Sequence, residues 1–356
     1  MKQKVKVIGG GLAGCECALQ LLEAGHPVDM YEMRPFKGTG AHSTDGLAEL
    51  VCSNSLKSEE PTTASGLLKA ELDALGCKLL SLAREARVPS GSALSVDRKM
   101  FSELVENKLN SYEHFRLIRE EVTELDDTPT VIATGPLTSD AMAAEISELS
   151  GEKRLFFYDA IAPIVSAESI DYSKAYFGGR YGKGGDDYLN LPMQRDEYEQ
   201  FYSELVSAQT VVLHDFEKSE LFEGCMPIEE MAKRGSDTIR FGPLKPIGLR
   251  NPDTGEKAYA VVQLRRENVA GDCFNLVGFQ TNLTYAEQKR VFGLIPALKN
   301  AEFLRYGIMH RNTYVYAPKV LDERFRVKGS VTPLYIAGQL SGVEGYVESI
   351  MSGMIA

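Results

Sequence analysis

The chain has few of the residues that build metal centres and disulfide frameworks, and it has no long hydrophobic run. Its six cysteines lie scattered over 356 residues, with no CxxC pair and no cysteine and histidine cluster at zinc spacing. No apolar stretch reaches the roughly 18 residues that span a bilayer. The first residues, MKQKVKVIGGG, have no secretory apolar core. We therefore expect a cytoplasmic protein with free thiols, no metal and no membrane contact.

Internal repeats and low-complexity tracts are also absent, and the charge is unevenly distributed. The composition, with 44% hydrophobic and 25% charged residues, is typical of a globular enzyme with two domains or one large domain with an insertion. The net charge of −11 argues against indiscriminate binding of nucleic acid. Residues 1–150 carry 15 basic and 23 acidic side chains, whereas residues 225–330 carry 17 and 11. A polyanion should therefore meet the second region, unless the difference is ordinary charge scatter.

A glycine fingerprint lies between a predicted strand at residues 4–9 and a predicted helix at 15–24. Its G-x-G-x-x-G residues are Gly9, Gly10, Gly11, Leu12, Ala13 and Gly14. In such a motif the glycines permit a tight turn, the approach of a pyrophosphate and close packing of helix on strand. A second strand at 27–31 ends in Glu32, where an acidic side chain can bind ribose hydroxyls. These elements, in this order, predict a dinucleotide-binding domain.

Two further strand patterns favour FAD over NAD as the bound dinucleotide. Residues 130–136, TVIATGP, resemble the second signature of two-dinucleotide-fold flavoproteins, and residues 333–339, PLYIAGQ, form a strand ending at Gly338. Proteins of this class usually have an acidic residue after that glycine, where this chain has Gln339. The helix start that follows reaches the flavin in such proteins, and it contains Gly342, Val343, Glu344, Gly345 and Tyr346. The sequence has no second G-x-G-x-x-G that would bind NAD.

These patterns predict an α/β fold, with a Rossmann-like FAD-binding domain of the two-dinucleotide-fold flavoprotein type and an inserted α/β domain. The FAD-binding domain would comprise residues 1–137 and 331–356, and the inserted domain residues 138–330. We expect helices at 58–75, 97–109, 195–206 and 286–294, strands at 259–264 and 275–279, and a strand pair within 115–126. Residues 40–58, 278–285 and 309–314 are expected to be loops.

Two cysteines stand out by their local sequence. Cys225 precedes Pro227 and a short predicted helix that begins with that proline and stops at Gly235. A thiol at the head of a helix feels the positive end of the dipole, which favours the thiolate. Cys52 lies between the apolar pair Leu50 and Val51 and the residues SNS, as expected for a turn that presents its thiol. Either cysteine can instead be a small apolar residue at a turn.

Further motifs extend along the whole chain. They are VIGGGLAG, YEMRP, AELVCSNSL, VPSGSALSVDR, IATGPLTS, FEGCMPIEEMAKRG, FGPLKPIGL, YAVVQLR, VGFQT, RYGIMHRNT and AGQLSGVEGYVES. Together they resemble the family of folate- and FAD-dependent tRNA uracil-5-methyltransferases over essentially the full length. AELVCSNSL and FEGCMPIE are far more specific than the glycine fingerprint.

The resemblance implies a methylation at C5 of a uridine in the T-loop of tRNA. Addition of a thiolate to C6 makes C5 nucleophilic enough to attack an electrophilic carbon. In the family, 5,10-methylenetetrahydrofolate supplies the one-carbon unit, which passes through reduced FAD. The flavin also supplies a hydride, and NADH or NADPH reduces it again. The protein orients the pterin, the flavin and the base.

The resemblance also assigns residues by position. Cys225 looks like the thiol that adds to the base and Cys52 like a second active-site thiol near the flavin, although which one attacks uracil stays open. The folate-binding set is His310, Arg311 and Asn312. The cofactor-binding set comprises the glycine fingerprint with Glu32, Arg34, Gly338, Gln339 and residues 342–345. The expected contacts to RNA phosphates are Lys233, Arg234, Arg265 and Arg266.

The sequence departs from the family at two places. Ser43 stands where we expect a second histidine, so the role of that histidine does not transfer. The chain stops at Ala356, inside a glycine-headed helix that continues in family members, which indicates a truncated or a degenerate copy. We expect the helix from Gly345 to lose packing and the flavin to be held less tightly as a result.

Other functions stay open at this point. The protein can carry out the same methylation on ribosomal RNA, or it can be a flavin-dependent oxidoreductase that acts on a small molecule. A related flavoprotein that modifies wobble uridines shares the glycine fingerprint, but is not expected to share FEGCMPIE. The last alternative is a flavin-binding module without enzymatic activity. The sequence does not indicate the oligomeric state or the choice between NADH and NADPH.

Overall fold

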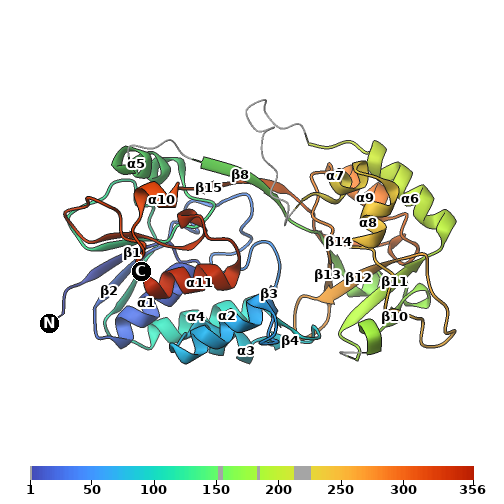
Figure 1. Cartoon of the computed structure of the whole chain (residues 1–356), viewed down its shortest axis with the longest axis horizontal. Coiled ribbons are helices and arrows are strands. Elements are labelled where there is room, and N and C mark those ends of the chain that lie inside the picture. The colour runs from blue at the N-terminus through green and yellow to red at the C-terminus, as the bar shows by residue number, and fades with distance from the viewer. Residues whose placement is uncertain (1, 151–154, 183–184, 212–225) are drawn as a thin grey trace.

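The computed structural model describes residues 2–150, 155–182, 185–211 and 226–356 and shows two lobes (Figure 1). The first lobe is built on a parallel sheet with the strand order β16-β7-β1-β2-β6. Its strands are β1 (Val5–Ile8), β2 (Val28–Tyr31), β6 (Phe115–Ile118), β7 (Thr130–Ile132) and β16 (Leu334–Ile336). The last strand comes from the far end of the sequence, so the C-terminal segment completes the sheet that the N-terminal segment begins.

Helices and a small antiparallel sheet complete the first lobe. The helices are α1 (Leu12–Glu23), α2 (Ala64–Ala74), α3 (Leu79–Glu85), α4 (Arg98–Asn110), α5 (Asp140–Ser150), α10 (Ala317–Val320) and α11 (Tyr346–Ile355). The small sheet contains β3 (Ser55–Ser58), β4 (Arg87–Val88) and β5 (Ala93–Val96), and a 3-10 turn, η7 (Gly338–Ser341), follows β16. Side-chain caps begin two of the helices, since Thr63 accepts from the Gly66 amide and Asp97 from the Met100 amide.

The second lobe has an antiparallel sheet with the order β10-β11-β12-β13-β9-β14. Its strands are β9 (Ile164–Ser166), β10 (Tyr176–Phe177), β11 (Tyr188–Met193), β12 (Ala260–Arg266), β13 (Cys273–Leu276) and β14 (Phe303–Arg305). Its helices are α6 (Arg195–Ser207), α7 (Ile228–Lys233), α8 (Ser236–Phe241) and α9 (Tyr285–Phe292), and its 3-10 turns are η1 (Ala167–Ser169), η2 (Tyr172–Lys174), η3 (Arg180–Gly182) and η6 (Pro296–Leu298). Phe201, Phe279 and Phe292 pack in its core.

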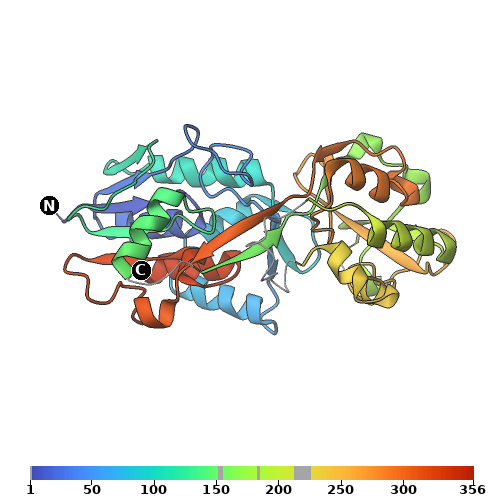
Figure 2. The ribbon, with the colours of Figure 1, turned by 90° about the horizontal axis from the view of Figure 1, so that it is seen from above.

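An antiparallel ribbon of β8 (Leu155–Ala160) and β15 (Met309–Tyr314) runs between the lobes (Figure 2). The lobes have separate cores, one made by residues near both ends of the chain and one by residues 162–301. Within the described residues, no helix is long and apolar enough to cross a bilayer. The predicted α/β fold, with a Rossmann-like domain and a large insertion, is confirmed.

The structure corrects several predicted elements. Residues 309–314 form a strand and not a loop, because their partner β8 lies about 150 positions away and gives no local signal. Only Phe115–Ile118 of the predicted strand pair is a strand, while Val122 and Leu125 beyond it pack into the core. The helix expected from residue 58 begins at Ala64, after the capping side chain of Thr63.

Other differences concern packing and helix ends. Met142 and Val327, expected in the insertion, pack in the core of the first lobe, so the exact domain boundaries remain a prediction. Pro227 precedes α7 with extended backbone angles and is not its first helical residue. Helix α7 ends before Gly235, as predicted, and Gly235 then caps the start of α8. The helix from Gly345 keeps its packing, because Val347 and Ile350 are buried against α1.

Candidate functional site

The glycine fingerprint turns from β1 into α1 beside a cavity of the first lobe. The glycines at 9 and 14 are needed by the protein itself: a Cβ on Gly14 would lie 1.9 Å from the carbonyl oxygen of Gly9, whose φ is +107°. Gly11 differs, since a Cβ there would find no protein atom within 4 Å. The backbone is therefore open at Gly11, at the head of α1, where unpaired amides and the helix dipole favour a phosphate.

The cavity encloses about 990 Å³, part of it open to solvent. It is lined by residues 8–13, 31–34, 120–122 and 133–139, together with His42, Glu49, Val51, Met142, Gly338, Gln339, Tyr346 and Ser349. Most of these segments come from β1, β2, β6, β7 and β16 and the turns that follow them, so the carboxyl ends of parallel strands meet there. This is where open α/β sheets bind dinucleotides.

Glu32 and Arg34 form the centre of a buried polar network. The Glu32 carboxylate accepts hydrogen bonds from the Gly10 amide at 2.9 Å and from Nε of Arg34 at 3.0 Å. Arg34 also donates from Nη1 to Glu49 at 2.8 Å. Burial would raise the pKa of Glu32, but the hydrogen bonds and charge of Arg34 outweigh it, and the pKa is lowered. Glu32 is therefore ionised, with both oxygens engaged, beside the glycine turn.

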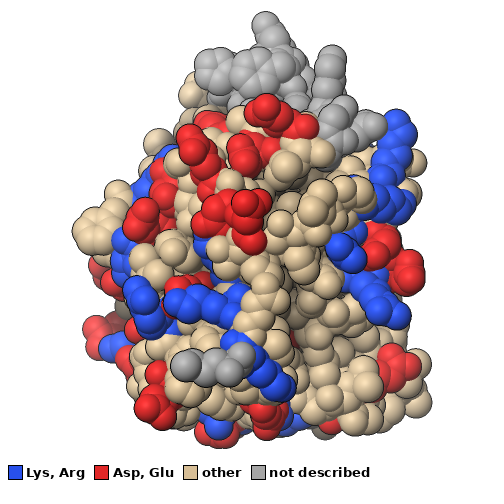
Figure 3. Space-filling view, turned by 90° about the vertical axis from the view of Figure 1, so that its left-hand side faces the viewer, with Lys and Arg blue, Asp and Glu red and all other residues tan. Residues whose placement is uncertain are grey.

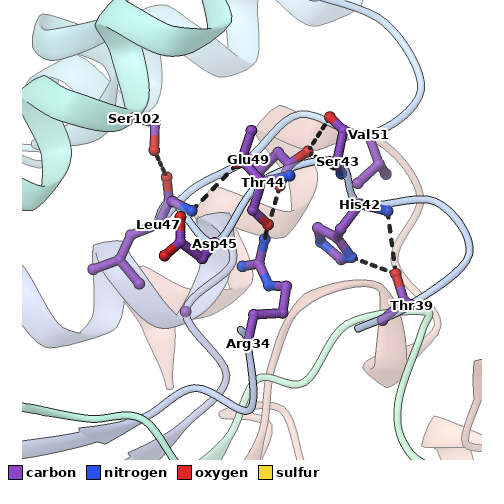
Figure 4. A network of polar contacts seen from close by, with 12 residues as sticks. Arg34, Thr39, His42, Ser43, Thr44, Asp45, Leu47, Glu49, Val51 and Ser102 are labelled. Carbon is purple, nitrogen blue, oxygen red and sulfur yellow. Dashed lines mark hydrogen bonds and ion pairs between the residues drawn. The ribbon is translucent and has the colours of Figure 1, made fainter. Parts of the chain in front are cut away.

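Glu49 extends this network to the segment around His42 (Figure 4). Its carboxylate accepts from the Ser43 amide at 2.8 Å and from the Thr44 hydroxyl at 2.9 Å. Nδ1 of His42 lies 2.7 Å from the hydroxyl oxygen of Thr39. Burial, followed by the charge of Arg34, lowers the pKa of His42 to about 4, so this ring is neutral at pH 7.

His310 and Asn312 lie on one side of β15 and present buried polar atoms without a partner. Nδ1 of His310 and Oδ1 of Asn312 have no hydrogen-bond partner among the described residues. Burial, followed by the charge of Arg305, lowers the pKa of His310 to about 4. Because buried polar groups are normally paired, these atoms point to a ligand with polar groups of its own.

Cys52 lies in a loop between the cavity and the ribbon. The hydroxyl oxygen of Tyr346, at the head of α11, accepts from the amides of Cys52 at 2.8 Å and Ser53 at 3.1 Å. The Cys52 thiol lies 3.9 Å from the carbonyl oxygen of Ala160, the last residue of β8. Val51 and Tyr346 line the cavity, so Cys52, which follows Val51 and is bonded to Tyr346 through its amide, lies at the edge of the cavity without lining it.

The predicted site residues divide into groups. The fingerprint residues 9–13, Glu32, Arg34, Gly338 and Gln339 line the cavity, whereas Gly14 packs against Gly9 and residues 342–345 do not line it. Cys225 and the side chain of Arg311 lie outside what the structure describes. Lys233 and Arg234 lie at the end of α7, and the half-buried Arg266 lies over the Phe177 ring. The structure does not favour Arg265 as a phosphate contact, because it is buried and bonded to Ser53 and Asn54.

The sequence-based prediction missed His42 and Glu49. It included Tyr346 only as part of a helix start expected to contact the cofactor, and not as a partner of the Cys52 loop. Glu49 lies within AELVCSNSL and Tyr346 within AGQLSGVEGYVES, but their roles depend on partners distant in sequence. The residues that are present fit FAD: an open glycine, a free helix N-terminus and a cavity along the strand ends. Among the described residues, no group of three or more His, Cys, Asp or Glu side chains is placed to hold a metal ion.

Comparison with known proteins gives consistent matches. The model of the family "Glucose inhibited division protein A" matches residues 4–356. A curated relative from Aquifex aeolicus, methylenetetrahydrofolate–tRNA-(uracil-5-)-methyltransferase TrmFO, is 57% identical and aligns with 100% of this chain and 80% of its own length. The protein of that name from Listeria innocua is 53% identical, over 100% of this chain and 82% of its own.

Solved structures agree at the level of the fold. Aquifex aeolicus GidA superposes in two crystal forms with TM-scores of 0.71 and 0.73, at 16% and 17% identity. The alignments cover 99% and 100% of this chain but 62% and 65% of those proteins, so the chain spans just under two thirds of their length. The chain therefore belongs to the glucose inhibited division protein A family, and within it to the TrmFO group of methylenetetrahydrofolate–tRNA-(uracil-5-)-methyltransferases.

Proposed function

We propose that this protein transfers a one-carbon unit from 5,10-methylenetetrahydrofolate to C5 of a uridine in the T-loop of tRNA, with FAD as cofactor and NADH or NADPH as reductant. The observation that carries the proposal is that a presented thiol and a dinucleotide cavity share one site. The Cys52 loop and the glycine turn are connected by Tyr346 and Val51, which line the same cavity. The names of the relatives supply the substrate class.

The overall reaction balances with these components. The methylene carbon and a hydride equivalent from the reductant become the methyl group, C5 of the base loses a proton, and tetrahydrofolate is released. FAD, when bound, supplies the redox chemistry of this step. The protein supplies the thiols, since a thiolate that adds to C6 makes C5 nucleophilic. We assign that addition to Cys225 and the second active-site thiol to Cys52.

Two groups near Cys52 suit the binding of a pterin beside a flavin. His310 and Asn312 have buried polar atoms that lack partners within the described structure, and both belong to the strand next to Ala160. Because the pKa of His310 is lowered, the ring is neutral at pH 7 and can stack on a heterocycle without carrying charge into the site. We assign His310 and Asn312, with Arg311, to folate binding.

The proposed RNA surface lies on the second lobe and includes Lys233, Arg234 and Arg266. Residues 225–330 have an excess of basic side chains, whereas residues 1–150 are acidic. The end of the first lobe that faces away from the second shows acidic side chains gathered over its upper part (Figure 3). Since phosphates are repelled from such a face, the tRNA would approach the second lobe. In this proposal, residues 138–330 serve as the substrate domain.

An assay with labelled methylenetetrahydrofolate tests the proposal. FAD-loaded protein is incubated with NADPH or NADH and with unmodified tRNA or ribosomal RNA, and the label in each RNA is counted. We expect label in tRNA and none when FAD is removed. Label in ribosomal RNA alone would move the same chemistry to that substrate, and no label in either would reject a methyltransferase. Cys225→Ser should abolish transfer, and full activity in this variant would refute the assigned nucleophile.

A further inference from the structure

The loop that carries Cys52 is bonded to a buried arginine of the second lobe. Arg265, on β12, donates from Nη2 to the Ser53 hydroxyl at 2.7 Å and from Nε to Oδ1 of Asn54 at 2.8 Å. Asn54 in turn donates to the backbone carbonyl of Arg266 at 2.9 Å. The two residues that follow Cys52 are thus fixed to one strand of the other lobe.

A second arginine of that lobe holds the residues before the thiol. Nη2 of Arg305, at the end of β14, donates to the carbonyl oxygens of Val51 at 2.9 Å and Ala41 at 3.1 Å. From the first lobe, Arg98 donates to the Leu50 carbonyl at 2.7 Å and forms an ion pair with Glu267 of the second lobe at 2.9 Å. Guanidinium groups therefore contact residues 50, 51, 53 and 54, on both sides of Cys52.

These contacts are unlike those of an arginine that only stabilises the fold. Arg265 is 7% exposed, and within the described part of the chain it donates to neutral oxygens alone. The charge of the buried Glu267 offsets part of the cost of burying this guanidinium, but it does not account for the two hydrogen bonds to Ser53 and Asn54. The planar fork of the arginine does account for them, because two donors in fixed geometry can set the positions of two consecutive residues at once.

We infer that Arg265 and Arg305 are positioning residues, which hold the Cys52 loop in place from the second lobe. The position of the Cys52 thiol is therefore fixed by contacts from the second lobe, although the segment that carries it belongs to the first lobe. A ligand that shifts the second lobe will move Cys52 relative to the dinucleotide cavity. The inference rests on the proposed function in two respects, namely that Cys52 is an active-site thiol and that the second lobe binds RNA. The contacts that hold the loop do not depend on the proposed function.

The alkylation rate of Cys52 in the folded protein tests this inference without any methyl transfer. The protein is treated briefly with iodoacetamide in the absence of RNA, and each cysteine is quantified by peptide mass spectrometry. Arg265→Lys keeps the charge and loses the fork, so we expect Cys52 to react about tenfold faster, as the loop opens more often. Arg305→Gln should act in the same direction.

Two internal comparisons separate positioning from general destabilisation. Arg290→Lys, at an exposed position of α9 in the second lobe, should leave the Cys52 rate within about twofold of the original protein. Cys15, which is buried in α1, reports global opening and should react no faster in Arg265→Lys. If Cys15 accelerates as much as Cys52, the arginine acts on overall stability and the inference is wrong.

A double-mutant cycle tests the contact itself. Ser53→Ala removes one acceptor of Arg265, so Arg265→Lys should change the Cys52 rate less in that background than alone. If Arg265→Lys changes the Cys52 rate equally with and without Ser53→Ala, Arg265 does not position the loop through Ser53. A Cys52 rate in Arg265→Lys that matches the original protein would overturn the inference. A chain that fails to methylate RNA but shows these rates would refute the proposed function and leave the inference standing.

Discussion

Gly11 and Gly14 lie three residues apart in one turn, yet their surroundings differ. A Cβ at Gly14 would collide with the carbonyl oxygen of Gly9, whereas one at Gly11 would meet no protein atom. At the scale of single residues, the fingerprint therefore combines a glycine that the fold requires with one that only a ligand requires.

The first prediction compares these two glycines. Gly14→Ala should lower the free energy of unfolding by about 3 kcal/mol, because the turn must shift. Gly11→Ala should cost no more than about 1 kcal/mol, the scale of a helix N-cap change, while flavin retention falls sharply. Urea unfolding of the flavin-free protein and flavin absorbance after gel filtration measure the two effects. Full flavin retention in Gly11→Ala would contradict a pyrophosphate at this turn.

The second prediction concerns the buried histidines. The pKa values of His42 and His310 are lowered from 6.5 to about 4, so between these pH values the unfolded chain binds more protons than the folded one. The free energy of unfolding should therefore be highest above pH 7. It should fall as the pH drops toward 4, by up to about 3 kcal/mol per histidine.

Urea unfolding between pH 7.5 and about pH 5, in His310→Gln beside the original protein, checks this prediction. The variant lacks one of the two titrating rings, so its free energy of unfolding should fall less steeply with decreasing pH. A constant offset between the two curves over the whole range would show that the pKa of His310 is the same in the folded and the unfolded chain, and would contradict the prediction.

At the scale of elements, Tyr346 joins the head of α11 to the Cys52 loop. Its hydroxyl oxygen accepts two backbone amides from residues almost 300 positions earlier. Tyr346→Phe leaves these half-buried amides without that acceptor and should lower the free energy of unfolding by about 1–3 kcal/mol. Tyr335→Phe, in β16, is the control, since its hydroxyl makes no hydrogen bond in the described part of the chain. Equal losses in the two variants would contradict the link.

Local patterns predicted the elements around the glycine fingerprint well. The strands, the helix and the acidic end lie next to one another in sequence. Strand β7 is buried throughout and β16 is buried except for the half-buried Tyr335, so both have apolar sequences. The strand of residues 309–314 was missed because its polar side chains resemble a loop and its partner β8 is far away. Pairing over such a distance leaves no periodic signal.

The candidate site could be predicted only in part, for a related reason. Charge and composition cannot distinguish a buried arginine from an exposed one, so Arg265 was expected at the RNA surface although it is bonded to Ser53 and Asn54. His42 and Tyr346 are positioned by contacts with residues that are distant in sequence, and local sequence patterns do not predict such contacts. The glycines were predictable because a backbone requirement is local.

At the scale of the whole molecule, the two lobes carry different features. The first lobe contains the dinucleotide cavity, and the second lobe carries the basic side chains of the proposed RNA surface. Arg266→Ala should weaken tRNA binding and lower the slope of log affinity against log salt by about one. Lys99→Ala, at an exposed position of the first lobe, is the control and should change neither quantity. An unchanged slope in Arg266→Ala would remove this residue from the RNA surface.

The origin of the methyl group is the central claim, and nucleoside mass spectrometry tests it most directly. FAD-loaded protein, NADPH and unmodified tRNA are incubated with methylenetetrahydrofolate whose methylene group carries carbon-13 and two deuteriums. We predict 5-methyluridine that is heavier by one carbon-13 and two deuteriums, with the third hydrogen from the reductant. Unlabelled 5-methyluridine, or none in tRNA from protein that holds FAD, would contradict folate-dependent methyl transfer.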